Sequence, residues 1–246
     1  MAVVEKTVDI LGDETLSAFI LARRIPEGNP VDFYDEAVKT LKNFALRGMA
    51  GMHTVNFPYV TTVGSYAFTN CPDLTKVILP AVTSISTSAF QSCKKLFEVE
   101  LPLVRSLGDS SFSGCILLES VELPNILNLA TSSFSGCNAL ESVVLPRVQT
   151  IGTNAFLNCT SLVQLDLPSV KSISSTVIRG AGSLEVINIG PSITSIHSQA
   201  FQNAPEGLVI NLPVAEGAIS GAPWGATNAI INYDTPYAGT VPIPQS

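Results

Sequence analysis

Five cysteines are the side chains in this sequence best suited to metal or redox chemistry, and their spacing is regular. They recur every 22 residues, at Cys71, Cys93, Cys115, Cys137 and Cys159. Zinc sites use ligands clustered at short spacing, such as Cys-x-x-Cys, and no such pair occurs here. Ala181 and Ala204 take the same position in later repeats, which indicates a slot for a small buried group. We therefore predict free, buried thiols that act as small hydrophobic groups, and no metal site.

Two other groups that could do chemistry are explained more simply by the repeat. His53 and His197 lie near opposite ends of the periodic region, so a rigid stack keeps them too far apart for a two-histidine site. Gly108-Asp109-Ser110 superficially resembles a serine-protease nucleophile, but Asp109 and Ser110 fall in columns shared with other repeats. Because the sequence also holds no phosphate-binding loop and no acid–base pair in a cleft, we expect no enzyme, no catalytic residue and no cofactor.

Acidic residues around the expected strands form the remaining candidate site. The candidate ligand-binding residues are Phe97, Glu98, Glu100, Glu119, Glu122, Glu141, Asp166 and Glu185. Glu100 would stack on Glu122, and Glu119 on Glu141, and like charges at that spacing are mildly destabilising unless something offsets them. A cationic ligand or partner would offset them, and so would hydration alone. The face is therefore either a solvated surface that keeps the sheet soluble or a binding surface.

The elements that would position these residues follow from a repeat of 22 residues. Prolines recur from Pro58 to Pro168, phenylalanines from Phe68 to Phe156 and leucines from Leu74 to Leu184, all in one register with the cysteines. Several columns with the same step indicate a solenoid, in which stacked coils bury apolar side chains that no single coil could bury alone.

Each coil should contain one strand, one bend and one helical turn. The run Val77-Ile78-Leu79-Pro80 is short, β-branched and ended by a proline, as expected of a strand, and Val82 and Ile85 would line the opposite wall. The next column holds residues that favour helix N-caps, namely Asn43, Ser65, Thr87, Asp109, Thr131, Thr153, Ser175 and Ser198. Five residues further on stand Gly48, Asn70, Ser92, Gly114, Gly136, Asn158, Gly180 and Asn203. Nearly all are Gly or Asn, the residues that tolerate a left-handed conformation at a helix end.

The repeat divides the chain into three parts. Residues 34–212 would form a solenoid of about eight coils. Residues 1–33 would cover its first coil, with an amphipathic helix from Asp13 to Arg24. Residues 213–246 would cover the last coil with Pro223-Trp224-Gly225 and Ile230-Ile231, followed by a loose tail that contains Pro236, Pro242 and Pro244.

Composition narrows the kinds of partner. A formal net charge of −7, with charged residues at only 13%, argues against nucleic acid and anionic membranes, which need clustered Lys and Arg. A neutral or cationic partner stays open. The longest apolar run, Leu16 to Ala22, is far shorter than the ~20 residues that cross a bilayer. No secretory signal is visible, because Glu5 and Asp9 interrupt the region where it would lie.

The repeat pattern Leu-Pro-x-Val-x-x-Ile-x-x-x-Ala-Phe-x-x-Cys-x-x-Leu-x-x-Val-x closely resembles the BspA-type leucine-rich repeat. This resemblance implies an α/β leucine-rich-repeat solenoid, wound as a right-handed superhelix, with a parallel β-sheet on its concave face. Many members are bacterial surface proteins that attach to host proteins or other cells, so the resemblance implies an extracellular or cell-surface location. It provides no catalytic residues.

Two functions follow as expectations. The first is a non-catalytic binding scaffold for a protein or cell-surface ligand, which could be cationic. The second is a structural protein of a phage or prophage, because Gly221-Ala222-Pro223-Trp224-Gly225-Ala226 resembles endings of prophage repeat proteins. In that case the two end segments would serve assembly. Oligomeric state and ligand identity are left open.

Overall fold

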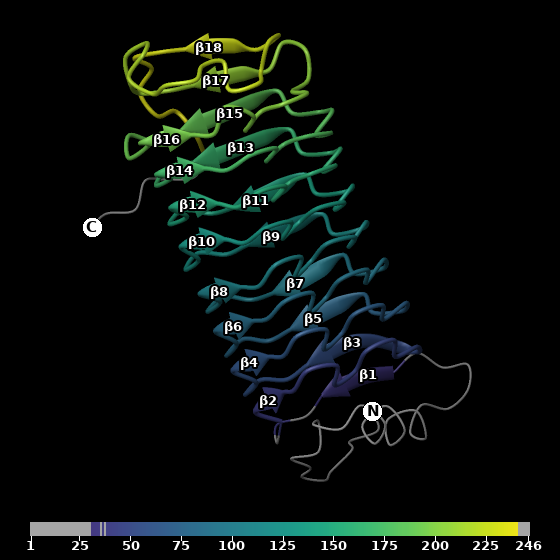
Figure 1. The fold of residues 1–246 in the computed structure, drawn as a ribbon. Helices are drawn as coiled ribbons and strands as arrows, with labels where there is room; N and C mark the ends of the chain where they lie inside the picture. The colour runs from purple at the N-terminus through teal and green to yellow at the C-terminus, as the bar shows by residue number, and fades with distance from the viewer. Residues whose placement is uncertain (1–30, 35, 37, 241–246) are drawn as a thin grey trace.

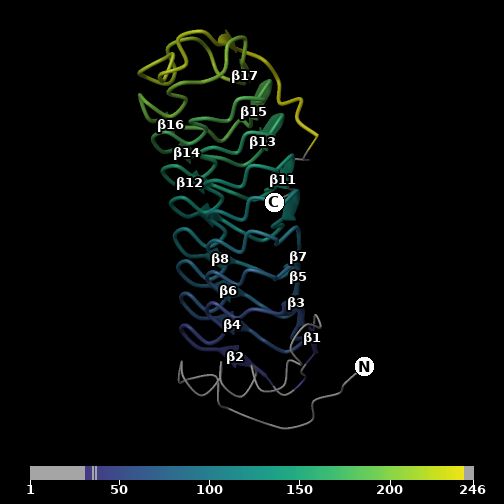
Figure 2. The same ribbon diagram turned by 90° about the vertical axis from the view of Figure 1, so that its right-hand side faces the viewer.

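The computed structural model of the chain describes residues 31–34, 36 and 38–240 (Figure 1). These residues form a parallel β-solenoid of about nine coils. The coils stack along one axis, and each coil from β1 to β16 contributes one strand to each of two opposite faces, whereas β17 and β18 add strands to one face only (Figure 1, Figure 2). The amphipathic helix predicted from Asp13 to Arg24 lies outside the described residues.

One face, here called the long-strand face, carries strands of three to five residues. Its strands are β1 (Val31–Tyr34), β3 (Met52–Asn56), β5 (Lys76–Ile78), β7 (Glu98–Glu100), β9 (Ser120–Glu122), β11 (Ser142–Val144), β13 (Gln164–Leu167), β15 (Val186–Ile189), β17 (Val209–Asn211) and β18 (Ile230–Asn232). Pairing is parallel, and Val77, for example, lies opposite Val99. The apolar middle residues point inward and their neighbours point outward, because successive side chains of a strand alternate between its two faces.

The opposite face, here called the short-strand face, carries strands of only two residues. They are β2 (Thr40–Leu41), β4 (Thr62–Val63), β6 (Ser84–Ile85), β8 (Ser106–Leu107), β10 (Asn128–Leu129), β12 (Thr150–Ile151), β14 (Ser172–Ile173) and β16 (Ser195–Ile196). In every pair the second, apolar residue is buried, as the sequence predicted for Ile85. The first residue is polar and lies at the surface.

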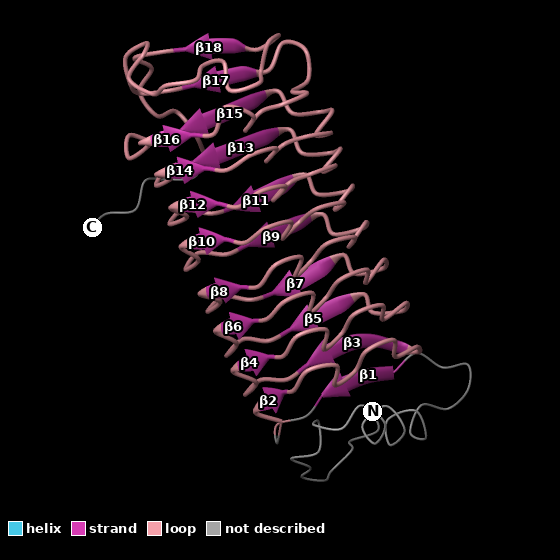
Figure 3. Cartoon of the chain, in the orientation of Figure 1, coloured by secondary structure: helices cyan, strands magenta, loops and turns pink. Residues whose placement is uncertain are grey.

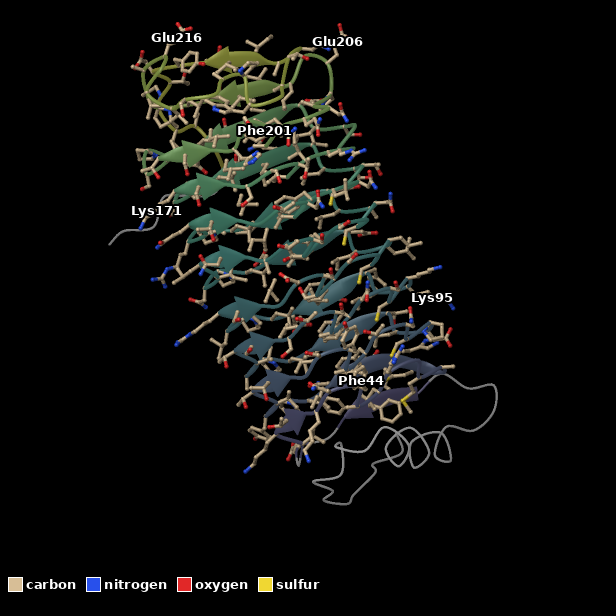
Figure 4. All side chains as sticks on the ribbon, viewed as in Figure 1. Phe44, Lys95, Lys171, Phe201, Glu206 and Glu216 are labelled. Atoms are coloured by element: carbon tan, nitrogen blue, oxygen red, sulfur yellow. The ribbon has the colours of Figure 1, made fainter. Side chains whose placement is uncertain are left out.

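The core between the two faces consists of the predicted columns, aligned as continuous inner rows. The five phenylalanines of the 22-residue column, Phe68, Phe90, Phe112, Phe134 and Phe156, are fully buried, and their rings stack. Successive ring centroids lie 4.9, 5.1, 5.6 and 5.9 Å apart, with interplanar angles of 6° to 9°. Ile178 continues this row. Phe201 lies near the β18 end (Figure 4). Its ring instead meets that of Trp224 edge-on, with 6.4 Å between the ring centroids. The 22-residue period therefore fixes the interior of the molecule.

The prediction of one helical turn in each coil is wrong. Within the described residues there is no helix, and the segments between the cap and stop columns are successive β-turns (Figure 3). In the segment from Lys42 to Met49, the amides of Ala45, Arg47 and Met49 donate to carbonyls three residues back. Phe44 and Gly48 have φ values of 62° and 69°. They stand third in their turns, where a type II turn requires positive φ.

No helical turn forms because every second backbone amide in this segment donates its hydrogen bond to a carbonyl of the neighbouring coil. The amides of Phe44, Leu46 and Gly48 donate to the carbonyls of Ser65, Ala67 and Thr69 in the next coil, at 2.7 to 2.8 Å. An α-helix would direct these amides to carbonyls four residues back, so they cannot do both. The same ladder recurs coil after coil along the turn edge of the molecule.

Side chains of the cap column also accept hydrogen bonds from the neighbouring coil. Asn43 and Asp109 each accept a hydrogen bond from the backbone amide of the residue 22 positions later, Ser65 at 2.8 Å and Thr131 at 3.1 Å. The stop column is left-handed, as its Gly and Asn residues predicted, and φ at Asn158 is 58°. A second left-handed column, from Phe44 to Thr176, was not predicted.

The hydrogen-bonded strand order is interrupted at one level on both faces. On the long-strand face a sheet ends at β7 and another begins at β9; on the short-strand face the order ends at β8 and resumes at β10. The turn-edge ladder continues across this level, with the amides of Ser110, Phe112 and Gly114 donating to the next coil at 2.8 to 2.9 Å. We call this level the seam. The long-strand face has a further interruption between β11 and β13, but the short-strand face does not.

The candidate binding face

The cysteine column is confirmed as five free, buried thiols. Each thiol also donates a hydrogen bond to the carbonyl 25 residues earlier; Cys115, for example, lies 3.1 Å from the Phe90 carbonyl oxygen. Burial raises the pKa of Cys115 and of Cys159 to about 12. A thiol with such a pKa stays protonated at neutral pH and is a poor nucleophile. No cluster of three or more His, Cys, Asp or Glu side chains suited to a metal occurs in the part of the chain that the structure describes.

The other chemical candidates stay apart. His53 lies in β3, whereas His197 follows β16 near the opposite end of the stack. Asp109 bonds the next coil through the Thr131 amide, and Ser110 occupies the second left-handed column, with a φ of 56°. Both residues of the protease-like sequence thus serve the turns.

Part of the acidic face is neutralised by a lysine. The Lys76 ammonium lies 2.6 Å from Glu98 Oε1 and 2.9 Å from Glu100 Oε1, so one cation holds two carboxylates. The hydrogen bonds that Lys76 donates to Glu98 and Glu100 raise the pKa of Lys76. Register places Lys76 directly opposite Glu98 and Ile78 opposite Glu100. Lys76 and Glu98 are 22 residues apart and so fall in one column of the repeat, which means that this pairing could have been predicted from the sequence.

Four carboxylates on this face stay exposed and form no ion pair among the residues described. They are Glu119, Glu122, Glu141 and Glu185. Glu119 and Glu141 are neighbours on adjacent coils, because the Glu141 amide donates to the Glu119 carbonyl at 2.9 Å. The predicted stack of Glu100 on Glu122 falls at the seam, where β7 and β9 belong to separate sheets. Phe97 lies at the same edge with 45% of its surface exposed.

Asp166 differs from the other seven candidate residues because it is buried, with only 4% exposed. Its Oδ1 atom accepts a hydrogen bond from the Asn188 amide group at 2.8 Å. Its Oδ2 atom accepts from Gln164 at 2.8 Å, and from the backbone amide and hydroxyl of Thr240 at 2.6 and 2.7 Å. Burial alone would raise the pKa of Asp166, but the hydrogen bonds from Asn188, Thr240 and Gln164 outweigh it and hold the pKa below its ordinary value.

The sequence matches the BspA type leucine rich repeat region in six copies, over residues 31–138 and 83–207. The chain belongs to the BspA-type leucine-rich repeat family. The aligned rows of Phe, Cys and Leu are therefore the interior of a BspA-type solenoid, and the eight candidate residues lie on or beside one of its sheets.

Solved structures of other leucine-rich repeat proteins resemble this one. A leucine-rich repeat protein of T. pallidum is 32% identical with a TM-score of 0.50, and the match covers 56% of this chain and 74% of that chain. A leucine-rich repeat protein of Bacteroides ovatus is 23% identical with a TM-score of 0.47, over 81% of this chain and 64% of that chain. A leucine rich cell surface protein of Faecalibacterium prausnitzii is 24% identical with a TM-score of 0.42, over 80% and 64%. No functionally curated protein matches the sequence.

The described part of this BspA-type chain contains no helix that is long and apolar enough to cross a bilayer. Sequence reasoning missed one further contact, that of Thr240 with Asp166, 74 residues earlier. Thr240 lies outside the repeat, so periodicity could not relate it to a coil.

Proposed function

We propose that this BspA-type repeat protein is a non-catalytic binding scaffold, and that its long-strand face engages a partner protein through a lysine- or arginine-rich segment. The observation that carries this proposal is the group of exposed carboxylates without an ion pair, Glu119, Glu122, Glu141 and Glu185. In the coils just before them, Lys76 neutralises Glu98 and Glu100. The described acids that lack a partner are therefore concentrated on the later coils.

The rigidity of the stack favours this use. A partner whose cationic groups recur at the spacing between coils can meet Glu119 and Glu141 together, and no rearrangement of the coils is needed. Complementary charge of this kind mainly speeds encounter and sets specificity. Phe97 offers an apolar contact beside these acids. Attachment to a host or bacterial surface through such a segment is the biological role we propose.

The charged face is tested by Glu119→Gln combined with Glu141→Gln. Binding of a hexalysine peptide, measured by surface plasmon resonance, should weaken about tenfold, because two attractive charges worth about 0.7 kcal/mol each are removed. The matched control is Ser106→Lys combined with Ser195→Lys, on exposed positions of the short-strand face. The glutamate variant loses two negative charges and the control gains two positive ones, so both raise the formal net charge from −7 to −5, on different faces of the molecule.

The control should weaken binding far less than the glutamate variant does. Equal weakening by the two variants would mean that net charge alone attracts the peptide, and the long-strand face would lose its assigned role. Thermal unfolding of each variant shows that the fold is kept.

A further inference from the structure

A row of amide side chains on the long-strand face ends on Asp166. Strand register aligns Asp166 of β13 with Asn188 of β15, Asn211 of β17 and Asn232 of β18. Each asparagine donates through Nδ2 to the Oδ1 atom of the residue before it, at 2.8, 2.8 and 2.9 Å. All three bonds run in one direction, toward the carboxylate. Such a chain polarises cooperatively and favours the ionised acid.

The second oxygen of this carboxylate faces the end of the chain. After β18 the described chain turns back along the outer side of the long-strand face (Figure 2). Thr235 anchors it to the sheet, donating its amide to the Leu212 carbonyl at 2.9 Å. At the other end Thr240 gives both its amide and its hydroxyl to Asp166 Oδ2. Residues 235–240, here called the tail segment, therefore cross the face from β17 to β13.

The fit between the tail segment and the face is specific. A Cβ atom placed on Gly239 would overlap the Tyr237 hydroxyl oxygen and would lie 2.7 Å from the Asp166 carboxyl carbon. Only glycine fits there without a shift of those side chains. Burial raises the pKa of Tyr237, and the negative charge of Asp166 adds to that effect. The pattern that the face accepts is thus Tyr-x-Gly-Thr, in an extended conformation.

The tail segment is nevertheless shallowly held. Tyr237 and Gly239 are half-buried, Ala238 and Thr240 are exposed, and no residue of the segment is buried. By contrast, Trp224 in the same end region is completely buried. A surface segment without a buried anchor can leave its site at little cost in apolar contact.

We propose that the outer face of β13, β15, β17 and β18 is a peptide-binding site, occupied in cis by the tail segment and open in trans to an extended peptide of the pattern Tyr-x-Gly-Thr. Asp166 is its specificity determinant, because it takes the backbone amide and the hydroxyl of the fourth residue together. The tethered tail competes at an effective concentration of about a millimolar, so the free site is a minor state of the full chain. This site is separate from the exposed glutamates of the proposed function and does not depend on them.

The experiment uses full-length protein and a fluorescent synthetic peptide with the sequence of residues 233–240. Gly239→Ala should release the tail and let the peptide bind at least about tenfold more tightly than it binds the unaltered protein, because the tethered competitor is lost. Adding Asp166→Asn to Gly239→Ala should abolish that gain. Adding Glu206→Gln instead removes one exposed acid at the edge of the same end (Figure 4) and should leave it intact. Fluorescence anisotropy reports binding, and hydrogen exchange of residues 234–240 reports release.

Three outcomes overturn the proposal. The first is a tail that stays protected from exchange in Gly239→Ala, because the close contact at Gly239 would then be wrong. The second is a released tail with no peptide binding, which would make the segment a cover only. The third is equal binding of a peptide with alanine in place of its glycine. Should Gly239→Ala not fold, Thr240→Val removes the hydroxyl donor without a steric clash, and the same outcomes apply.

Discussion

At the scale of single residues, the Ser111 hydroxyl stands out because it is buried without a hydrogen-bond partner. The residue before each core phenylalanine is small, and Ala67, Ala89 and Ala155 hold it in three coils. Ser111 and Ser133 hold it on either side of the seam, and both are fully buried. The Ser133 hydroxyl donates to the Ala130 carbonyl at 2.7 Å. The Ser111 hydroxyl has no hydrogen-bond partner.

Replacing Ser111 by alanine should therefore stabilise the protein by about 1 kcal/mol, because a buried polar group without a partner costs that order of free energy. Urea denaturation at equilibrium measures the change. Ser133→Ala is the matched control, since it removes a hydroxyl that is bonded, and should be neutral or destabilising. If both substitutions shift the midpoint in the same direction by the same amount, the missing hydrogen bond is not the cause.

At the scale of elements, the strands could be predicted and the turns could not. Val77 and Leu79 alternate with outward residues, and Pro80 ends the run, so sequence alone places the strand. Gly48 and Asn70 predict a left-handed backbone conformation, but helix ends and type II turns both favour these residues. The choice between a helix end and a type II turn depends on which carbonyl accepts the hydrogen bond of the Leu46 amide. The acceptor is the Ala67 carbonyl, which belongs to another coil. A local pattern cannot specify a bond between coils.

The same limit applies to the candidate site. The columns placed Glu119 beside Glu141 correctly, because both lie inside the repeat. They placed Asp166 in the same band, yet its environment is set by Thr240, for which the repeat has no column. Prediction succeeds where the 22-residue step holds and fails where the chain leaves it.

The second left-handed column offers a test of backbone strain. Thr176 has a φ of 53° although it is β-branched, and such residues rarely adopt positive φ. Thr176→Asn should stabilise the protein by about 0.5 to 1 kcal/mol, because asparagine tolerates this conformation better. Thr131→Asn, in the neighbouring column without positive φ, should give no gain. Thermal unfolding of the two variants compares them, and an equal gain in both would count against strain at Thr176.

At the scale of the whole molecule, stability is a sum over interfaces between neighbouring coils. The stacked phenylalanines contribute to every such interface from Phe68 to Phe156. Their rings occupy the middle of the core, so the loss of one ring leaves a cavity that rigid neighbours on both sides cannot fill. Beyond this row, near the β18 end, the Trp224 ring packs edge-on against Phe201.

Phe112→Ala should cost about 3 to 5 kcal/mol, the usual cost of removing a buried aromatic ring. Its ring is packed between those of Phe90 and Phe134. Phe44→Ala provides the comparison, because the Phe44 ring also stacks, on Tyr66 at 5.1 Å, but at the surface. Its cost should stay near 1 kcal/mol. Chemical denaturation gives both values, and similar losses would show that burial of the row is not what stabilises the stack.

The seam has a mechanical consequence. Between the coils of β7 and β9 the molecule keeps its hydrogen-bonded connection along the turn edge and lacks it on the two strand faces. Bending stiffness there is therefore anisotropic. A force that opens the strand faces meets mainly side-chain packing, with one side-chain hydrogen bond from Asn125 to the Pro102 carbonyl just beyond the strands. A force that opens the turn edge must break a series of backbone hydrogen bonds. The two parts of the rod should flex relative to each other about that edge, and a partner that spans both parts could set the angle between them.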